Sequence, residues 1–326
     1  MKKYKIAIDV MGSDNGPSTV IKGANTALLN NPELELLLVG DIDVMRQECD
    51  ALNMDMSRVE LLHASDVITN YDNPSVAIFA KPESSLVKAL AAASERDDIC
   101  GLLNAGSTGA LITGSMRFLP GKVRVRPALA AVLPSEDGGF TCLVDTGATV
   151  DCGAELLHHF GIIGSEFMAK MYGIDSPRVG LLSNGAEKTK GNRTVKEAHQ
   201  LLEEDGNLNF IGNVEGNNAL LGVCDVLVCD GFAGNQVLKV TEGTARRIIT
   251  DIVKYARRTG KGEIMELVSY LMDTYDIASL GGGIILGVRK PVVKAHGRAD
   301  EKAIVSTTKM LLNMAKNVEV FEKKNQ

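Results

Sequence analysis

Residues 5–17 read KIAIDVMGSDNGP. A short apolar run, Lys5–Asp9, ends in a turn with two glycines, and Pro17 follows where a helix can begin, because proline suits the first helical turn. The same order recurs twice, where residues 99–104 lead into AGSTGA and residues 226–229 lead into DGFAGN. A strand that ends in a glycine turn before a helix is typical of α/β proteins.

The rest of the chain alternates in the same way. We expect strands at Lys5–Asp9, Leu34–Val39, Val59–Leu62, Ile99–Asn104, Leu129–Leu133, Thr141–Asp145, Arg178–Ser183 and Val226–Cys229. Helix-length segments occupy Thr19–Asn30, Ser85–Arg96, Ala154–Tyr172, Thr194–Glu204 and Asn235–Arg258. This alternation predicts a Rossmann-like αβα sandwich with a mostly parallel sheet. We expect one α/β domain over residues 1–326 with a protruding helical segment at about 250–280, although the length also allows two lobes.

Composition excludes several classes of protein. The 326 residues include 33 glycines and no tryptophan, and aromatic residues make up only 4%, which argues against stacking of nucleic-acid bases. The net charge of −6 gives no sign of a nucleic-acid partner. The sequence has no apolar run long enough for a membrane span and no signal-peptide pattern at Met1–Asp9, so we expect a cytoplasmic protein.

Cysteine and most histidine positions favour structural roles. The six cysteines form no C-x-x-C pair and are expected to be reduced core thiols. The adjacent His158 and His159 on a predicted helix point in different directions and make a poor metal pair. His63 and His199 have no partners in the sequence pattern.

The glycine turns at strand ends predict an anion site. Ligands of open α/β sheets bind at the carboxyl ends of strands, and glycine turns let backbone N–H groups and helix N-termini point at one anion. A tight strand–helix turn remains the structural alternative for each. Phosphate is the best inference, but the nucleotide motifs G-x-x-x-x-G-K-[ST] and G-x-G-x-x-G are absent, and only Asp41 resembles the acid that binds a ribose.

Two polar segments add candidate side chains. His296 lies among Lys294, Gly297 and Arg298, where a titratable ring could act as an acid or base near an anion. Lys190 and Asn192 flank Gly191 in a polar loop after the strand at 178–183. A structural histidine and a solvated loop are the respective alternatives.

A basic stretch precedes an apolar one near residue 260. Ile264–Met272 has apolar residues at near-helical spacing, and the cations before it are Arg246, Arg247, Lys254, Arg257, Arg258 and Lys261. This pattern suits an anionic lipid surface or an acidic carrier protein. The alternative is a helix buried in the core or in a dimer.

Several motifs together resemble one family, the phosphate acyltransferase PlsX family. The chain has IAIDVMGSD at 6–14, NAGSTGAL at 104–111, VDTGATVDC at 144–152, NFIGNVEG at 209–216 and VCDGFAGN at 228–235, in the family's order. The resemblance extends from Ile6 to the final helix.

The resemblance implies transfer of a fatty acyl group from acyl carrier protein to inorganic phosphate, giving acyl phosphate for phospholipid synthesis. It also implies a homodimer that needs no metal or other cofactor, attaches peripherally to the inner face of the membrane and supplies glycerol-3-phosphate acyltransferase. The implied fold is similar to isocitrate/isopropylmalate dehydrogenase and phosphotransacetylase.

For this activity we expect catalytic roles for Lys190, Asp230, Asn235 and His296. Lys190 and Asn235 would bind phosphate or the oxyanion, His296 would be the acid–base group, and Asp230 would orient one of these groups. The expected substrate-binding residues are Asp9, Gly12, Asp14, Gly106, Ser107, Thr108, Gly109, Asn192, Gly231 and Gly234. The alternatives are a phosphotransacetylase-like enzyme acting on acyl-coenzyme A, a nicotinamide-dependent dehydrogenase, and a binding protein without turnover.

Overall fold

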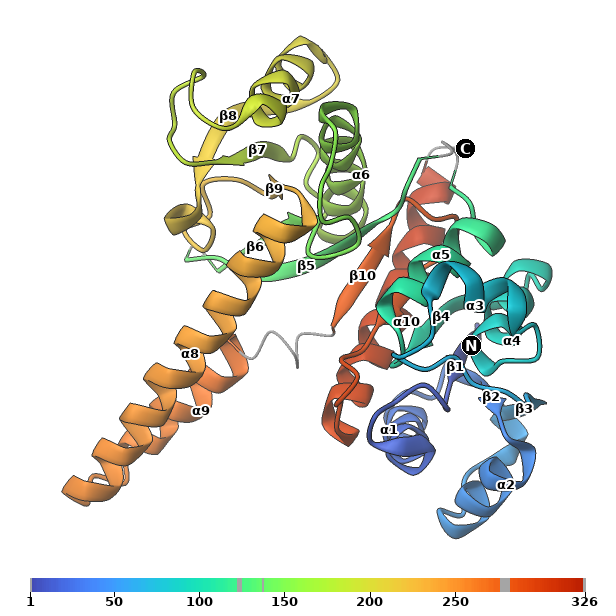
Figure 1. The fold of residues 1–326 in the computed structure, drawn as a ribbon. Helices are drawn as coiled ribbons and strands as arrows, with labels where there is room; N and C mark the ends of the chain where they lie inside the picture. Colours follow the sequence, from blue (N-terminus) through green and yellow to red (C-terminus); the bar gives the residue numbers. More distant parts are fainter. Residues whose placement is uncertain (1, 122–124, 137, 276–281, 325–326) are drawn as a thin grey trace. The chain divides into compact units, whose positions relative to one another are not determined.

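The structure is a computed structural model that describes residues 2–121, 125–136, 138–275 and 282–324 (Figure 1). The chain divides into two compact units. The first unit comprises residues 1–128 and 280–326, and the second comprises residues 129–279. None of the described helices combines the length and the apolar character that crossing a bilayer requires.

The first unit is built on a sheet in the order β3-β2-β1-β4-β11-β10. Its strands are β1 (Tyr4–Asp9), β2 (Leu34–Gly40), β3 (Val59–His63), β4 (Ile99–Asn104), β10 (Gly283–Leu286) and β11 (Val292–Lys294). Neighbouring strands run parallel except β10 and β11. β1 and β2 are apolar on both faces, as strands covered by helices on both sides must be.

Two groups of helices cover this sheet. One group is α1 (Gly16–Asn30), α2 (Ile42–Ala51) and α10 (Glu301–Lys324), and the other is α3 (Pro74–Ala80), α4 (Ser85–Glu95) and α5 (Thr108–Phe118). The helices within each group pack on one another and on the sheet, which gives the predicted αβα layering in this unit (Figure 1).

The second unit has the strand order β5-β6-β9-β7-β8. Its strands are β5 (Ala128–Pro134), β6 (Phe140–Val144), β7 (Arg178–Ser183), β8 (Asn209–Glu215) and β9 (Val226–Val228). Only β5 and β6 pair in antiparallel fashion. Helices α6 (Ala154–Tyr172) and α7 (Arg193–Glu204) pack together on this sheet. The start of helix α8 (Gly231–Thr259) packs through Ala233, Val237 and Leu238 on a buried apolar cluster that includes Leu143 and Leu227.

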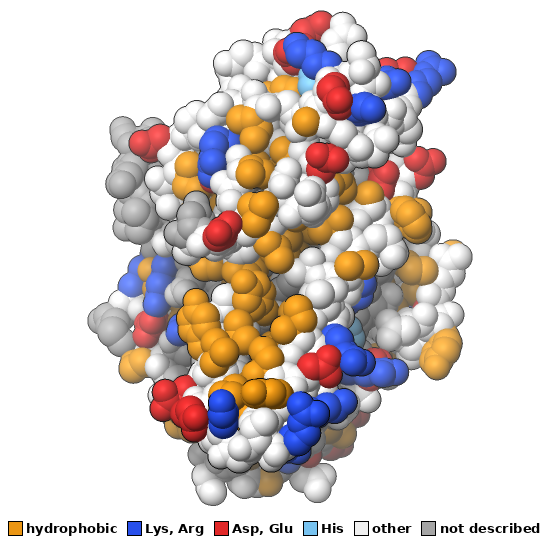
Figure 2. All heavy atoms as spheres, turned by 90° about the vertical axis from the view of Figure 1, so that its left-hand side faces the viewer, with side chains coloured by type: hydrophobic (Ala, Val, Ile, Leu, Met, Phe, Trp, Pro, Cys, Tyr) orange, Lys and Arg blue, Asp and Glu red, His pale blue; other side chains and the backbone are white. Residues whose placement is uncertain are grey.

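The long helix α8 packs against α9 (Ile264–Tyr275) to form a hairpin (Figure 1). The left-handed Gly260 ends α8 and allows the turn between the two helices. The hairpin carries exposed apolar side chains, which are Val240, Ile248, Tyr255, Met265, Leu267, Tyr270 and Met272. Figure 2 shows orange side chains gathered on this face of the molecule, with blue Lys and Arg side chains below them.

The predicted fold class is confirmed, and every predicted strand and helix is present within a few residues. α8 begins at Gly231, four residues before the predicted start, because the Asp230 carboxylate caps it by accepting from Ala233 N at 2.7 Å. Strand β8 was missed because it is half-exposed and polar. Helix α2 was missed because it buries only Met45 and Cys49.

Asp41, the six cysteines and two of the histidines have structural roles. Asp41, which resembled a ribose-binding acid, caps α2 by accepting from Asp43 N and Val44 N. All six cysteines are free, and only Cys100 is not buried. His158 lies 2.8 Å from Asp205, and the buried His199 lies 2.9 Å from Asn213 Oδ1, so both serve tertiary packing.

Candidate functional site

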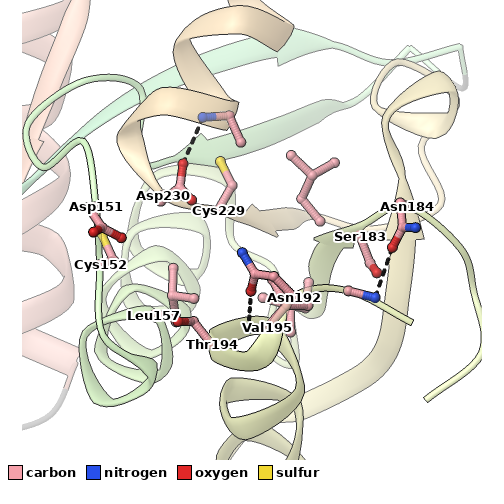
Figure 3. Close-up of a pocket in the computed structure, with 14 residues that line it drawn as sticks. Asp151, Cys152, Leu157, Ser183, Asn184, Asn192, Thr194, Val195, Cys229 and Asp230 are labelled. Carbon is pink, nitrogen blue, oxygen red and sulfur yellow. Dashed lines mark hydrogen bonds between the residues drawn. The ribbon is translucent and has the colours of Figure 1, made fainter. Parts of the chain in front are cut away.

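A cavity of about 450 Å³ opens in the second unit (Figure 3). It lies where β7 and β9 end, since Ser183 closes one strand and Cys229 and Asp230 follow the other. The other lining residues are Asp151, Cys152, Leu157, Leu181, Leu182, Asn184, Gly191, Asn192, Thr194, Val195 and Ala233. The carboxyl ends of parallel strands are where open α/β sheets bind ligands.

Three helices begin at this cavity. Asn192 caps α7 by accepting from Val195 N at 2.9 Å, and Asp230 caps α8 (Figure 3). Gly153 precedes α6 and offers no side-chain cap. Helix N-termini attract anions through their free N–H groups and dipoles. The carboxylates of Asp151 and Asp230 also line the cavity, so an anion bound here needs a cation beside it.

The loop before α7 carries an exposed lysine next to Gly191, which lines the cavity. Gly191, which has a φ of 92°, donates its N–H to Asn184 Oδ1 at 2.8 Å, and this bond folds residues 184–191 into a compact turn (Figure 3). Lys190 directly precedes Gly191, is exposed, and forms no ion pair among the described residues. Its neighbour Lys188 is instead paired with Glu203.

Asp145 is a buried aspartate that follows β6 and begins the loop on which the start of α8 packs. Its oxygens accept N–H bonds from Leu129, Gly147, Ala148 and Thr149 at 2.7–3.2 Å. Burial raises the pKa of Asp145, and the four N–H donors oppose that rise by favouring the ionised form. The sequence motif containing Asp145 was noticed, but nothing local indicated that its side chain organises a whole loop.

The two glycines at the start of α8 make contact with this loop. A Cβ on Gly231 would lie 2.7 Å from Asp145 Oδ2, and one on Gly234 would lie 1.9 Å from the Asp145 carbonyl oxygen. The close approach that these glycines allow is therefore to protein backbone and carboxylate. Asn235 follows Gly234 in the same helical turn and does not line the cavity.

The thiols of the cavity are poor nucleophiles. Burial raises the pKa of Cys152 to about 12 and raises that of Cys229 well above its usual value. A thiol is reactive only as the thiolate, so neither side chain is suited to covalent catalysis.

The first unit holds a second polar cluster at the ends of β1 and β4. Asn104 Nδ2 donates to Asp9 Oδ2 at 2.8 Å, and Asn104 Oδ1 accepts from Gly106 N at 2.9 Å. Asp9 is 1% exposed, and burial raises its pKa. A Cβ on Gly12 would lie 2.9 Å from the Gly106 Cα, so these two turns need glycine to pack on each other.

The other predicted residues of the first unit surround this cluster. Ser107 caps α5, whose first turn contains Thr108 and Gly109, and Gly109 packs against Pro74. Asp14 N donates to the carbonyl of Gly297 at 2.9 Å, which ties the first loop to the segment that carries His296. The exposed His296 accepts from Arg298 N through Nδ1 at 3.2 Å.

The predicted site residues thus form two groups. Asp9, Gly12, Asp14, His296 and residues 106–109 belong to the first unit, whereas Lys190, Asn192, Asp230, Gly231, Gly234 and Asn235 belong to the second. Only Asn192 and Asp230 line the cavity of the second unit. Among the described residues, no cluster of three or more His, Cys, Asp or Glu side chains could hold a metal ion.

Residues 4–320 match the family model described as "Fatty acid synthesis protein". A phosphate acyltransferase from Lactococcus lactis is 39% identical over 98% of this chain and 99% of its own length. One from Thermoanaerobacter pseudethanolicus is 39% identical over 96% of this chain and 94% of its own. The chain belongs to the phosphate acyltransferase (PlsX) family. The resemblance drawn from the motifs is confirmed, and the family is one of acyltransferases.

Solved structures agree with this fold. A phosphotransacetylase from Streptococcus pyogenes superposes with a TM-score of 0.65 at 14% identity, covering 97% of this chain and 94% of that one. A 4-hydroxythreonine-4-phosphate dehydrogenase from Burkholderia phymatum gives a TM-score of 0.51 at 14% identity, covering 98% of both chains. At these identities the likeness concerns the fold alone.

Proposed function

We propose that this chain transfers a fatty acyl group from acyl carrier protein to inorganic phosphate, giving acyl phosphate and free carrier protein. The observation that carries the proposal is the near full-length match to phosphate acyltransferases. Glycine turns, helix N-termini and a lysine loop suited to anions support it. The product is an activated acyl donor, and we propose that a glycerol-3-phosphate acyltransferase consumes it in phospholipid synthesis.

In the proposed reaction a phosphate oxygen attacks the thioester carbonyl carbon. A tetrahedral oxyanion forms, the C–S bond breaks, and the carrier thiolate leaves and takes up a proton. The protein needs no nucleophile of its own, which agrees with the raised pKa of the cavity thiols. The protein must hold the phosphate dianion in position to attack the carbonyl carbon, and it must stabilise the oxyanion.

We assign the residues as follows. The turn at 106–109 cradles phosphate, with Asp9, Gly12 and Asp14 supporting it. Lys190 and Asn235 neutralise or hydrogen-bond the phosphate or the oxyanion, and Asn192, Gly231 and Gly234 are further substrate-binding residues. His296 exchanges the proton of the thiol, and Asp230 orients its neighbours.

Incubating the protein with palmitoyl-acyl carrier protein and phosphate should release carrier thiol and form palmitoyl phosphate in equal amounts. The reaction is measured by trapping the acyl phosphate with hydroxylamine and by thiol titration, with and without phosphate. No cofactor is added. Acetyl-coenzyme A serves as the comparison donor, and faster turnover with it than with the carrier-bound substrate would contradict the proposal.

We further propose a cytoplasmic homodimer that attaches peripherally to the inner face of the membrane. The exposed apolar side chains of α8, Val240, Ile248 and Tyr255, are suited to a second copy of the chain. Those of α9 follow the cations Arg257, Arg258 and Lys261, a combination that suits anionic lipid. The acidic acyl carrier protein is proposed to approach the same basic residues.

Leu267→Asp should weaken binding to vesicles of anionic phospholipid by about tenfold or more, because it places a charge in the apolar face of α9. Vesicle flotation measures the binding. Leu29→Asp, at an exposed leucine of the first unit, is the control and should bind as the unchanged protein does. Sedimentation should give a dimer mass for both variants. Equal flotation of the two variants would count against lipid contact through α9.

A further inference from the structure

Lys294 is a buried lysine that the sequence analysis did not place in the site. It ends β11 in the middle of the first unit's sheet, with Asn104 of β4 on one side and Gly283 of β10 on the other. Lys294 is only 7% exposed to solvent. Burial lowers its pKa to about 8.

The ammonium group of Lys294 is poorly compensated by the protein. Its Nζ donates to the carbonyl of Ala295. The Asp14 carboxylate favours the charged form of Lys294 but makes no ion pair with it, and no other described carboxylate pairs with it. A lysine ammonium has three N–H donors, so one carbonyl leaves most of its hydrogen-bonding capacity unused. Buried charges are normally paired, because desolvation is costly.

The surroundings of Lys294 are the loops predicted to bind phosphate. Ala295 N donates to the Asn104 carbonyl at 2.9 Å, and Asn104 in turn holds Asp9 and the Gly106 N–H. Ser13 Oγ donates to the Gly297 carbonyl at 3.2 Å, which fixes the first loop beside the same segment. Lys294 therefore lies at the strand ends where the turn before α5 begins.

We propose that Lys294 is the cation that binds inorganic phosphate in the first unit, together with the backbone N–H groups of Ser107, Thr108 and Gly109. This inference rests on the proposed function and adds to it a binding residue. A phosphate dianion would supply the paired countercharge and the further acceptors that Lys294 lacks among the described residues.

Lys294→Met tests this assignment by removing the charge and keeping the length of the side chain. The KM for phosphate should rise by about 10- to 100-fold, the range expected for a lost charged hydrogen bond. The KM for the acyl donor should change little. Stabilisation against heat by added inorganic phosphate, with potassium chloride at equal ionic strength as reference, should be lost.

Lys290→Met is the matched control. Lys290 is also a partly buried lysine of the first unit, but its Nζ donates to the carbonyls of Arg96 and Ile99 at 2.8 and 2.9 Å. This variant should melt at a lower temperature and keep the phosphate KM. Lys294→Met should melt at or above the temperature of the unchanged protein without phosphate, because it removes a poorly compensated buried charge.

The outcomes separate the two proposals. An unchanged phosphate KM and an unchanged thermal response in Lys294→Met would overturn the role of Lys294, as would a lower melting temperature with phosphate stabilisation intact. Failure of the unchanged protein to form acyl phosphate would instead overturn the proposed function. Phosphate binding by Lys294 remains measurable in that case, because the thermal response requires no turnover.

Discussion

Gly234→Ala is expected to lower the free energy of unfolding by about 4 kcal/mol or more. The added Cβ would lie 1.9 Å from the Asp145 carbonyl oxygen and 2.7 Å from Cys229 Sγ. Neither partner can move easily, because Asp145 anchors four N–H groups and Cys229 is buried. Displacing this loop would also disturb the cavity below α8. Urea unfolding followed by circular dichroism measures the loss.

Gly243→Ala in the same helix is the control. Gly243 is exposed, and nothing lies within 4 Å of a Cβ built on it. This substitution should stabilise the protein by about 0.5–1 kcal/mol, because alanine favours a helix interior over glycine. Similar effects of the two substitutions would show that helix propensity, and not the approach to Asp145, determines the result.

Lys190→Ala is expected to lower kcat/KM for phosphate-dependent acyl transfer by about 10²- to 10³-fold, the cost of losing one group that stabilises developing charge. Lys190 directly precedes Gly191, which lines a cavity whose Asp151 and Asp230 carboxylates would otherwise repel an anion. The measurement is steady-state release of the carrier thiol, with circular dichroism to show that the variant is folded.

Lys188→Ala is the matched control for this prediction. Lys188 lies two residues earlier in the same loop, but it is paired with the exposed Glu203. Exposed ion pairs contribute little to the stability of the fold. This variant should therefore stay folded and keep its activity within about twofold. If Lys190→Ala also keeps full activity, the cation that assists the reaction is not Lys190.

Much of the fold could be predicted because apolar runs and turn residues close together in the sequence determine its strands and helix starts. The apolar runs at 6–8 and 36–38 are buried on both faces, and the glycine turns and Pro17 mark where helices begin. The elements that escaped prediction are those whose sequence is ambiguous by itself. β8 is stabilised by pairing with β7 at the sheet edge, and β10 pairs with β11 over only three residues.

The candidate site was less predictable than the fold. The motif order identified the family, and the turns at 12, 106 and 231 were correctly placed at strand ends. The sequence did not indicate that Gly231 and Gly234 lie against Asp145, since Gly231 and Asp145 are 86 positions apart. It also gave no reason to single out Lys294 over the more suggestive His296 beside it.

Residues 5–17 show what the local sequence determines and what only the tertiary structure determines. By itself, KIAIDVMGSDNGP determined a buried strand, a glycine turn and a helix start, because hydrophobic burial and backbone geometry act over neighbouring residues. Tertiary structure alone decided that Asp9 would share a hydrogen bond with Asn104, that Gly12 would pack on Gly106, and that Lys294 would lie buried beside them. Strand pairing brings together residues nearly 300 positions apart, and burial then gives them charges and pKa values that no local pattern contains.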